Sequence, residues 1–147
     1  MEQYSKIYLY RRIVQAKIFI DIHFSENLDL HNISDEAYFS RFHFIWLFKT
    51  IYKKTPHQYL TIVRIENAKL LLKNDIPISG VCYAIGFSSV SSFTGLFKRI
   101  VGITPSLYQQ RQAQLKADIA KTPLKYIPNC FAQNNGLTKN SNFKEVV

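Results

Sequence analysis

The chain has 147 residues, of which 47% are hydrophobic and 14% aromatic, which is enough for one packed domain or two very small ones. Its formal net charge is +9, and this positive excess favours a polyanionic partner, either nucleic acid or an acidic membrane surface. The start of the chain lacks the basic-then-apolar layout of a secretory signal, and its most apolar run, residues 42–48, is too short to span a bilayer. We therefore expect a cytosolic protein.

The cysteines and histidines do not follow the spacings of metal or catalytic sites. Cys82 and Cys130 lack a CxxC or Cys/His partner spacing, so neither a zinc site nor a disulfide framework is expected. The four histidines show no HExxH spacing, and the sequence contains neither a Gly-rich phosphate loop nor a GxSxG elbow. The chain is therefore not expected to be an enzyme or to hold a cofactor. Cys82 lies in an apolar helical pattern and is interpreted as a small core residue.

Taken in chain order, the elements predict an all-α protein of about seven helices. Ile13, Ala16 and Ile20 recur at spacings of three and four, which predicts a first helix over about residues 7–24. Asp29 is a plausible N-cap for a short second helix that runs to about position 37.

The next helix belongs to a stretch that occurs twice, as residues 40–59 and 89–108. At an offset of 49, nine of twenty positions are identical, including four apolar ones at the i, i+3, i+4, i+7 spacing of a buried helical stripe. These four are Phe44, Leu47, Phe48 and Ile51 in the first copy and Phe93, Leu96, Phe97 and Ile100 in the second. Ser40 is the expected N-cap of the first-copy helix, which runs to about position 52. The two helices are expected to be buried in the same way and to present different outward side chains.

A long helix without Gly or Pro is predicted between the two copies. Thr55-Pro56 signals its start, because threonine can cap free N–H groups and the fixed φ of proline suits the first helical position. The helix is expected over residues 57–73, with Leu60, Val63, Asn67 and Leu71 on one side. At ~1.5 Å per residue it spans roughly 25 Å, so it is predicted to act as a rigid spacer.

The second copy is preceded by a short helix and a tight turn. Residues 78–85 predict this helix, and Gly86 stands where a sharp turn needs a left-handed residue. Gly102 is expected to end the second-copy helix, and Thr104-Pro105 to begin a last helix that reaches about position 120. The inward positions of the short helix are expected to be Ile78, Val81, Cys82 and Ile85.

A short helix, a tight turn and a helix with a mixed outer face form the helix-turn-helix pattern, which occurs here twice. We therefore divide the chain into helix-turn-helix subdomains over residues 1–55 and 75–121, joined by a linker helix over residues 56–74. Residues 122–147 are rich in Asn, Lys, Thr and Ser and are expected to form a mostly disordered polar tail. On DNA, two recognition helices must lie about 34 Å apart on one face of the duplex, and a continuous linker helix can fix that separation.

Three segments together resemble the signature of the DNA-binding domain of the AraC/XylS family of bacterial transcription regulators. They are IPISGVCYAIGFSSVSSF at 76–93, FKR at 97–99 and GITPSLY at 102–108, and the similarity extends over residues 14–111. The resemblance implies two helix-turn-helix units in successive major grooves and control of transcription through contact with RNA polymerase. Many relatives carry a separate effector-binding or dimerisation domain for which this chain has no room. The resemblance therefore implies a stand-alone type that binds DNA as a monomer, or a fragment of a longer regulator, with no membrane partner.

The resemblance also assigns the side chains expected to face the bases. They are Arg41, Phe42, Ile45 and Trp46 in the first unit and Val90, Ser91, Ser92, Thr94 and Gly95 in the second. The family usually has arginine at positions 46 and 95, and an arginine contact to guanine contributes ~1–3 kcal/mol of discrimination. Because this chain lacks both, and because its apolar candidates can contact thymine methyl groups, we expect weak recognition that favours A·T pairs.

Phosphate contacts are expected from residues late on the two helices and from the helix N-termini. The residues expected to make these contacts are Ser40 and Lys49 in the first unit and Ser89, Lys98 and Arg99 in the second. Lys53, Lys54 and Lys73 are interpreted as solvated.

Two alternatives stay open for the first unit: Ile45 and Trp46 fold back onto the first helix, or the apolar set docks a protein while only the second unit contacts DNA. A DNA-bound protein of this kind is expected in the cytoplasm, at the nucleoid.

Overall fold

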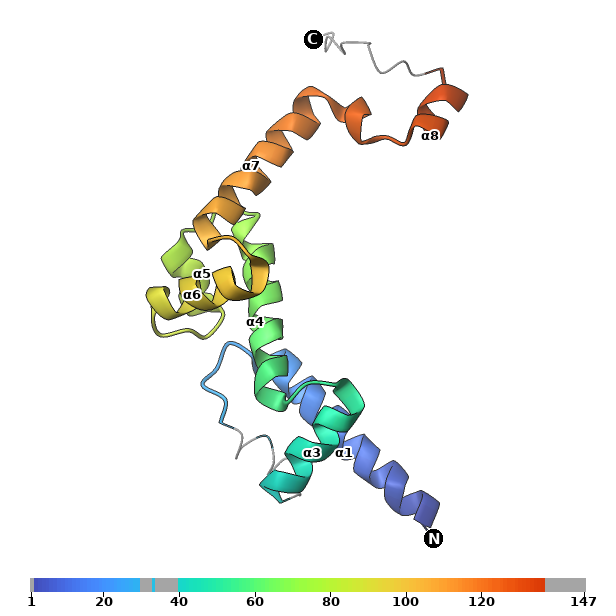
Figure 1. Ribbon diagram of the computed structural model, residues 1–147, viewed down its shortest axis with the longest axis vertical. Helices are drawn as coiled ribbons and strands as arrows, with labels where there is room; N and C mark the ends of the chain where they lie inside the picture. The colour runs from blue at the N-terminus through green and yellow to red at the C-terminus, as the bar shows by residue number, and fades with distance from the viewer. Residues whose placement is uncertain (1, 30–32, 34–39, 137–147) are drawn as a thin grey trace.

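The computed structural model describes residues 2–29, 33 and 40–136, and every regular element within these residues is a helix. The elements are α1 (Glu2–His23), α3 (Arg41–Tyr52), α4 (Pro56–Leu72), α5 (Ile78–Ala84), α6 (Val90–Val101), α7 (Pro105–Lys121), the 3-10 helix η1 (Pro123–Tyr126) and α8 (Asn129–Asn134) (Figure 1). The prediction of an all-α protein is confirmed. Within the described part of the chain, no helix is both long enough and apolar enough to cross a membrane.

Short polar residues cap the helices at the places that the sequence indicates. The Ser40 hydroxyl accepts a hydrogen bond from the His43 N–H at 3.4 Å, and Ser89 caps α6 in the same way. Thr55 and Gln58 form a reciprocal capping box at the start of α4, with distances of 3.2 Å and 3.0 Å. These caps pair backbone N–H groups that have no partner inside the helix, so α3, α4 and α6 each begin at a defined residue.

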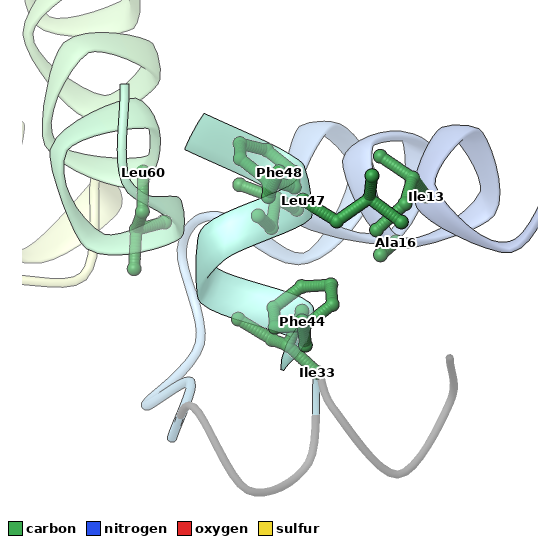
Figure 2. Close-up of a cluster of buried hydrophobic side chains, with 8 residues drawn as sticks. Ile13, Ala16, Ile33, Phe44, Leu47, Phe48 and Leu60 are labelled. Carbon is green, nitrogen blue, oxygen red and sulfur yellow. The ribbon is translucent and has the colours of Figure 1, made fainter. Parts of the chain in front are cut away.

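The side chains form two hydrophobic cores, and α4 contributes to both. In the first core α1 and α3 pack together with the first turns of α4 (Figure 2). Its buried members are Ile13, Ala16, Ile20, Ile33, Phe44, Leu47, Phe48 and Leu60. In the second, the rest of α4 packs against α5 and α6, and the buried members are Ile65, Ala68, Leu72, Val81, Cys82, Ile85, Phe93 and Phe97. Figure 1 shows the consequence: α3 lies beside one end of α4, and α5 and α6 lie beside the other.

The internal repeat extends to the helices that support α3 and α6, the two predicted recognition helices. Ile13, Ala16 and Ile20 of α1 have the same spacing as Ile65, Ala68 and Leu72 of α4, at an offset of 52, and all six are buried. The second half of α4 therefore has the role in the second unit that α1 has in the first. The supporting helices repeat at an offset of 52, but α3 and α6 repeat at an offset of 49. The chain between α1 and α3 is therefore three residues longer than the corresponding chain between α4 and α6.

Two predicted buried stripes need correction. Leu60, Val63, Asn67 and Leu71 were expected to lie on one buried side of α4, but only Leu60 is buried. The α4 side chains that fill the second core begin at Ile65. They lie about a third of a turn around the helix from the expected side. Ile51 and Ile100 were expected to be buried but are 36% and 43% exposed. Both lie in the last turn of their helices, beyond the side chains that cover the rest of the stripe. Leu96 is half-buried.

The two ends of the chain also differ from prediction. The first helix begins at Glu2, about five residues earlier than expected. The expectation of a mostly disordered tail is wrong for residues 122–136, which contain η1 and α8 with Leu124 and Ala132 buried. Composition did not indicate this, because the contacts are made by single apolar side chains within a polar stretch. Residues 137–147 and most of the second predicted helix lie outside the described residues. Within that predicted helix, Ile33 is described: it is helical and buried, and its N–H donates to the Asp29 carbonyl at 3.3 Å.

Replacement of a core phenylalanine is expected to destabilise either unit. Phe44→Ala and Phe93→Ala each remove a fully buried ring and should lower the free energy of unfolding by about 3–5 kcal/mol. Phe42→Ala is the matched control, because Phe42 is 84% exposed and its loss should change stability by less than ~0.5 kcal/mol. Urea unfolding followed by circular dichroism measures all three. Equal losses for Phe42 and Phe44 would contradict the assignment of buried and outward faces.

Candidate nucleic-acid interface

The outward face of α3 is formed by large side chains with little polar content. Phe42 is 84% and Trp46 58% exposed, and Arg41 is also exposed. The Trp46 ring lies beside His43 of the same helix, with ring centroids 6.1 Å apart. Ile45 is half-buried and packs against the first core. Of the two residues in the fold-back alternative, Ile45 thus packs inward and Trp46 remains mostly exposed.

The outward face of α6 is smaller and carries hydroxyl groups. Ser91 and Ser92 are exposed, whereas Thr94 and Val90 are half-buried and Val90 packs against the second core. A Cβ atom built at Gly95 would meet no atom within 4 Å, so this part of the helix is open to a close approach. The two recognition helices therefore share a buried side but offer different surfaces, one aromatic and one hydroxyl-rich.

The expected phosphate contacts are of two kinds. Lys49 and Lys98 occupy the same position in the two copies, and both are exposed, as is Arg99. Ser40 and Ser89 use their hydroxyl oxygens as acceptors for helix N–H groups, and the Ser89 oxygen also lies 3.0 Å from the Ser91 hydroxyl. These serines fix the starts of the helices, so their expected contribution to anion binding comes from helix N-termini rather than from free side chains.

The charge of the chain is strongly segregated. All ten acidic residues lie outside the segments 37–65 and 76–117, which hold five and four Lys or Arg. Elsewhere ten Lys and Arg balance the ten acids, so the whole excess of +9 arises from the two segments that contain α3 and α6. This signal is present in the sequence, but the total charge does not reveal it. A polyanion approaching the recognition helices therefore meets no carboxylate from these segments.

A half-buried arginine, Arg64, links the two units. Arg64 in the middle of α4 donates from Nε to the Phe24 carbonyl and from Nη2 to the Glu26 carbonyl, both at 2.7 Å. Its guanidinium carbon lies 5.5 Å from the centre of the Phe87 ring, next to α6. Burial lowers the pKa of Arg64 below its ordinary value. The loop after α1 is thus held against both α4 and the turn before α6.

The turn before α6 also touches this loop directly. Gly86 has a φ of 84°, and a Cβ atom there would lie 2.6 Å from the carbonyl oxygen of Ser25. The predicted left-handed turn at Gly86 is confirmed, but the sequence did not indicate the close approach to Ser25. Together with Arg64, this contact restrains the orientation of the second unit relative to the first.

A polar network holds α1 against α4 within the first unit. The Tyr59 hydroxyl donates to Asp21 Oδ1 at 2.7 Å, and Lys17 Nζ lies 2.7 Å from Asp21 Oδ2. Hydrogen bonds with Asp21 and Tyr59 raise the pKa of Lys17, so the lysine stays charged. Tyr59 is one of the identical positions of the repeat, and this contact shows one reason for its presence in the first copy.

Comparison with known proteins agrees with this geometry. Residues 33–111, more than half of the chain, match the family described as "Helix-turn-helix domain". The chain belongs to this AraC/XylS-type helix-turn-helix family, whose members are DNA-binding transcriptional regulators and not enzymes.

Individual relatives match the same region. The chain is 36% identical over 92 residues to the probable transcriptional regulator LumQ of Photobacterium leiognathi, covering 62% of this chain and 37% of LumQ. It is 33% identical over 93 residues to the MmsAB operon regulatory protein of Pseudomonas aeruginosa, covering 63% and 30%. The chain thus spans well under half of the length of these relatives. Among solved structures, the DNA-binding domain of the global transcriptional factor AdpA in complex with a target DNA aligns with a TM-score of 0.65 and 27% identity, covering 76% of this chain and 96% of that one.

The contact between Gly86 and Ser25 can be tested with two glycines that share a backbone conformation. Gly102 has a φ of 90° and open space around it, so Gly102→Ala should cost about 1–2 kcal/mol from the left-handed backbone alone. Gly86→Ala adds a clash with a backbone oxygen and should cost at least ~1 kcal/mol more. Thermal unfolding of both variants measures the difference. Equal losses would mean that the turn does not press against the loop after α1.

Proposed function

We propose that this chain binds double-stranded DNA sequence-specifically, with α3 in one major groove and α6 in the next. The segregation of charge carries the proposal: the entire positive excess lies in two segments of the sequence, and each contains one of two matched helices with an exposed outer face. Phosphate neutralisation by such residues supplies most of the affinity for DNA, and base contacts then supply specificity. In this scheme residues 1–55 and 75–121 are the two binding units, and residues 56–74 are their linker.

The linker geometry supports simultaneous binding by both units. α4 has 17 residues and therefore a length of about 25 Å at ~1.5 Å per residue. Recognition helices that bind successive major grooves on one face of the duplex lie about 34 Å apart. Since α3 and α6 lie beside opposite ends of α4, a single chain holds two binding units apart along one helix, which favours binding at two grooves without a second subunit.

The role in the cell is proposed from the family. LumQ and the MmsAB operon regulator are named as regulators, and we infer that this chain also regulates transcription, through contact with RNA polymerase. It binds DNA as a monomer in this proposal, unless it is part of a longer regulator, and acts in the cytoplasm at the nucleoid. The proposal includes no cofactor.

The base-facing residues favour A·T-rich sites. Phe42 and Val90 offer apolar surface to thymine methyl groups, while Ser91 and Ser92 offer hydroxyls that can bond to either kind of base pair. Neither outer face carries an arginine at the positions of Trp46 and Gly95, where a bidentate contact to guanine would be made.

A second candidate function rests on the exposed aromatic pair of α3. Phe42 and Trp46 are 84% and 58% exposed and lie four residues apart on one face of α3, so they form an apolar patch that a partner protein could cover. In this version the first unit docks on another protein, and only α6 enters the DNA.

Selection from random duplexes tests the primary proposal. We expect an A·T-rich consensus with two contacted segments about one helical turn apart, because both units bind the same face of the duplex. Sequencing of the selected pool gives the result. A G-rich motif aligned under α3 or α6 would refute the proposed recognition by apolar and hydroxyl side chains.

Salt dependence tests the phosphate contacts. Lys98→Gln and Lys49→Gln should each reduce the slope of log K against log salt concentration by about 1, since each removes one neutralised phosphate. Lys73→Gln, interpreted as solvated, is the control and should leave the slope unchanged. Fluorescence anisotropy on the selected site at several salt concentrations measures the slopes. A slope that responds equally to all three changes would leave no specific role for Lys49 and Lys98.

Trp46→Ala distinguishes the two candidate functions. If α3 enters the groove, the change should weaken DNA binding by at least about fivefold, or roughly 1 kcal/mol, and leave the unfolding temperature nearly unchanged. The readouts are the affinity for the selected DNA and the affinity for RNA polymerase holoenzyme. Unchanged DNA binding with loss of polymerase binding would favour the docking function instead.

A further inference from the structure

A pocket of about 690 Å³ lies between the first half of α4 and the second recognition helix. Its apolar lining comes from Ile62 of α4, Phe87 of the turn before α6, and Leu96 and Ile100 of α6. The volume is within the range of ~300–1,000 Å³ that is typical of small-molecule sites. The pocket therefore has the size and lining of a ligand site, and it lies where the two units meet.

The apolar part of the pocket is a surface that the second core leaves uncovered. Leu96 and Ile100 belong to the repeated apolar stripe of α6, yet Leu96 is half-buried and Ile100 is 43% exposed. The counterpart of Leu96 in the first unit, Leu47, is only 8% exposed. The two units thus differ at this position, where Leu96 borders the pocket and Leu47 is packed, whereas Ile51 and Ile100 at the ends of the two helices are exposed to similar extents.

Two basic side chains also line the pocket, one from each of its walls. Lys54 lies just before α4, and Arg99 lies on α6. The described lining contains no carboxylate, and none of the described ion pairs involves Lys54 or Arg99. The start of a helix adds to the preference for negative charge.

We propose that this pocket binds a small molecule with a compact apolar body and a single carboxylate. The apolar lining would take the body out of water, and Lys54 and Arg99 would receive the carboxylate. A DNA phosphate satisfies the cations but not the apolar lining, and a neutral apolar molecule satisfies only the lining. An apolar carboxylate is the chemistry that uses both parts of the pocket.

Occupation of the pocket is expected to weaken DNA binding. Ser92 lines the pocket and is also one of the residues proposed to face the bases, so a ligand lies against the DNA-binding side of α6. This consequence rests on the proposed function, whereas binding of the carboxylate to the free protein does not.

Titration calorimetry of the free protein with octanoate, compared with octan-1-ol, tests the site. Octanoate should bind with one-to-one stoichiometry and more tightly than octan-1-ol. Lys54→Gln should weaken octanoate binding by about two- to fivefold, as expected for an exposed ion pair. Ile62→Ser should weaken both ligands by at least about fivefold through the loss of apolar surface. Lys121→Gln, an exposed lysine at the end of α7, is the matched control and should change neither affinity.

Amide NMR shifts and DNA competition complete the test. Octanoate should shift signals from the first half of α4 and from α6, and should raise the apparent Kd for the selected DNA in wild type more than in Ile62→Ser. Absence of octanoate binding, or shifts confined to α1, would overturn the site. If Lys54→Gln instead lowered the salt dependence of DNA binding and no octanoate bound, the pocket would be a phosphate contact and the proposal wrong. DNA binding without octanoate is measured in parallel, so failure of the pocket and failure of the proposed function give different results.

Discussion

The structure depends on one helix being packed into two cores at once. Leu60, near the start of α4, is buried with α1 and α3, while Ile65, Ala68 and Leu72 are buried with α5 and α6. Because the two sets lie on different sides of a continuous helix, the direction in which each recognition helix faces is set by the pitch of α4. Arg64 and the contact of Gly86 with Ser25 add a second connection between the units. Such a shared element makes the separation of α3 and α6 a property of the fold rather than of a flexible linker.

The two units have kept their inner faces and diverged on their outer faces. Identical phenylalanines fill both cores, whereas the outer positions differ: those of α3 include the aromatic Phe42 and Trp46, and their counterparts on α6 are Ser91 and Gly95. Acidic residues are absent from both surrounding segments, so the electrostatic attraction to a polyanion is common to the units, and the chemistry of recognition differs between them. This division is consistent with the proposal that the two related helices read two different half-sites.

Local signals in the sequence predicted much of this architecture. The caps at Ser40 and Thr55 and the turn at Gly86 depend on backbone groups within a few residues, and these predictions are confirmed. Features that depend on residues far apart in the chain were missed or wrong. The second face of α4, the hydrogen bonds from Arg64 to the loop after α1, and the exposure of Ile51 and Ile100 follow from how helices are placed around α4. Periodicity describes one helix at a time, so it does not contain this information.

In the proposed complex both units contact DNA at a separation fixed by α4. The most direct test is to insert five base pairs between the two half-sites of the selected duplex and to measure affinity by fluorescence anisotropy. The insertion rotates one half-site by about half a turn away from its recognition helix, since one turn contains about 10–10.5 base pairs. A rigid connection predicts that affinity falls to the level of a single half-site. Affinity that stayed within about twofold of the original site would contradict the account, because it would mean that the units bind independently or that only one of them binds.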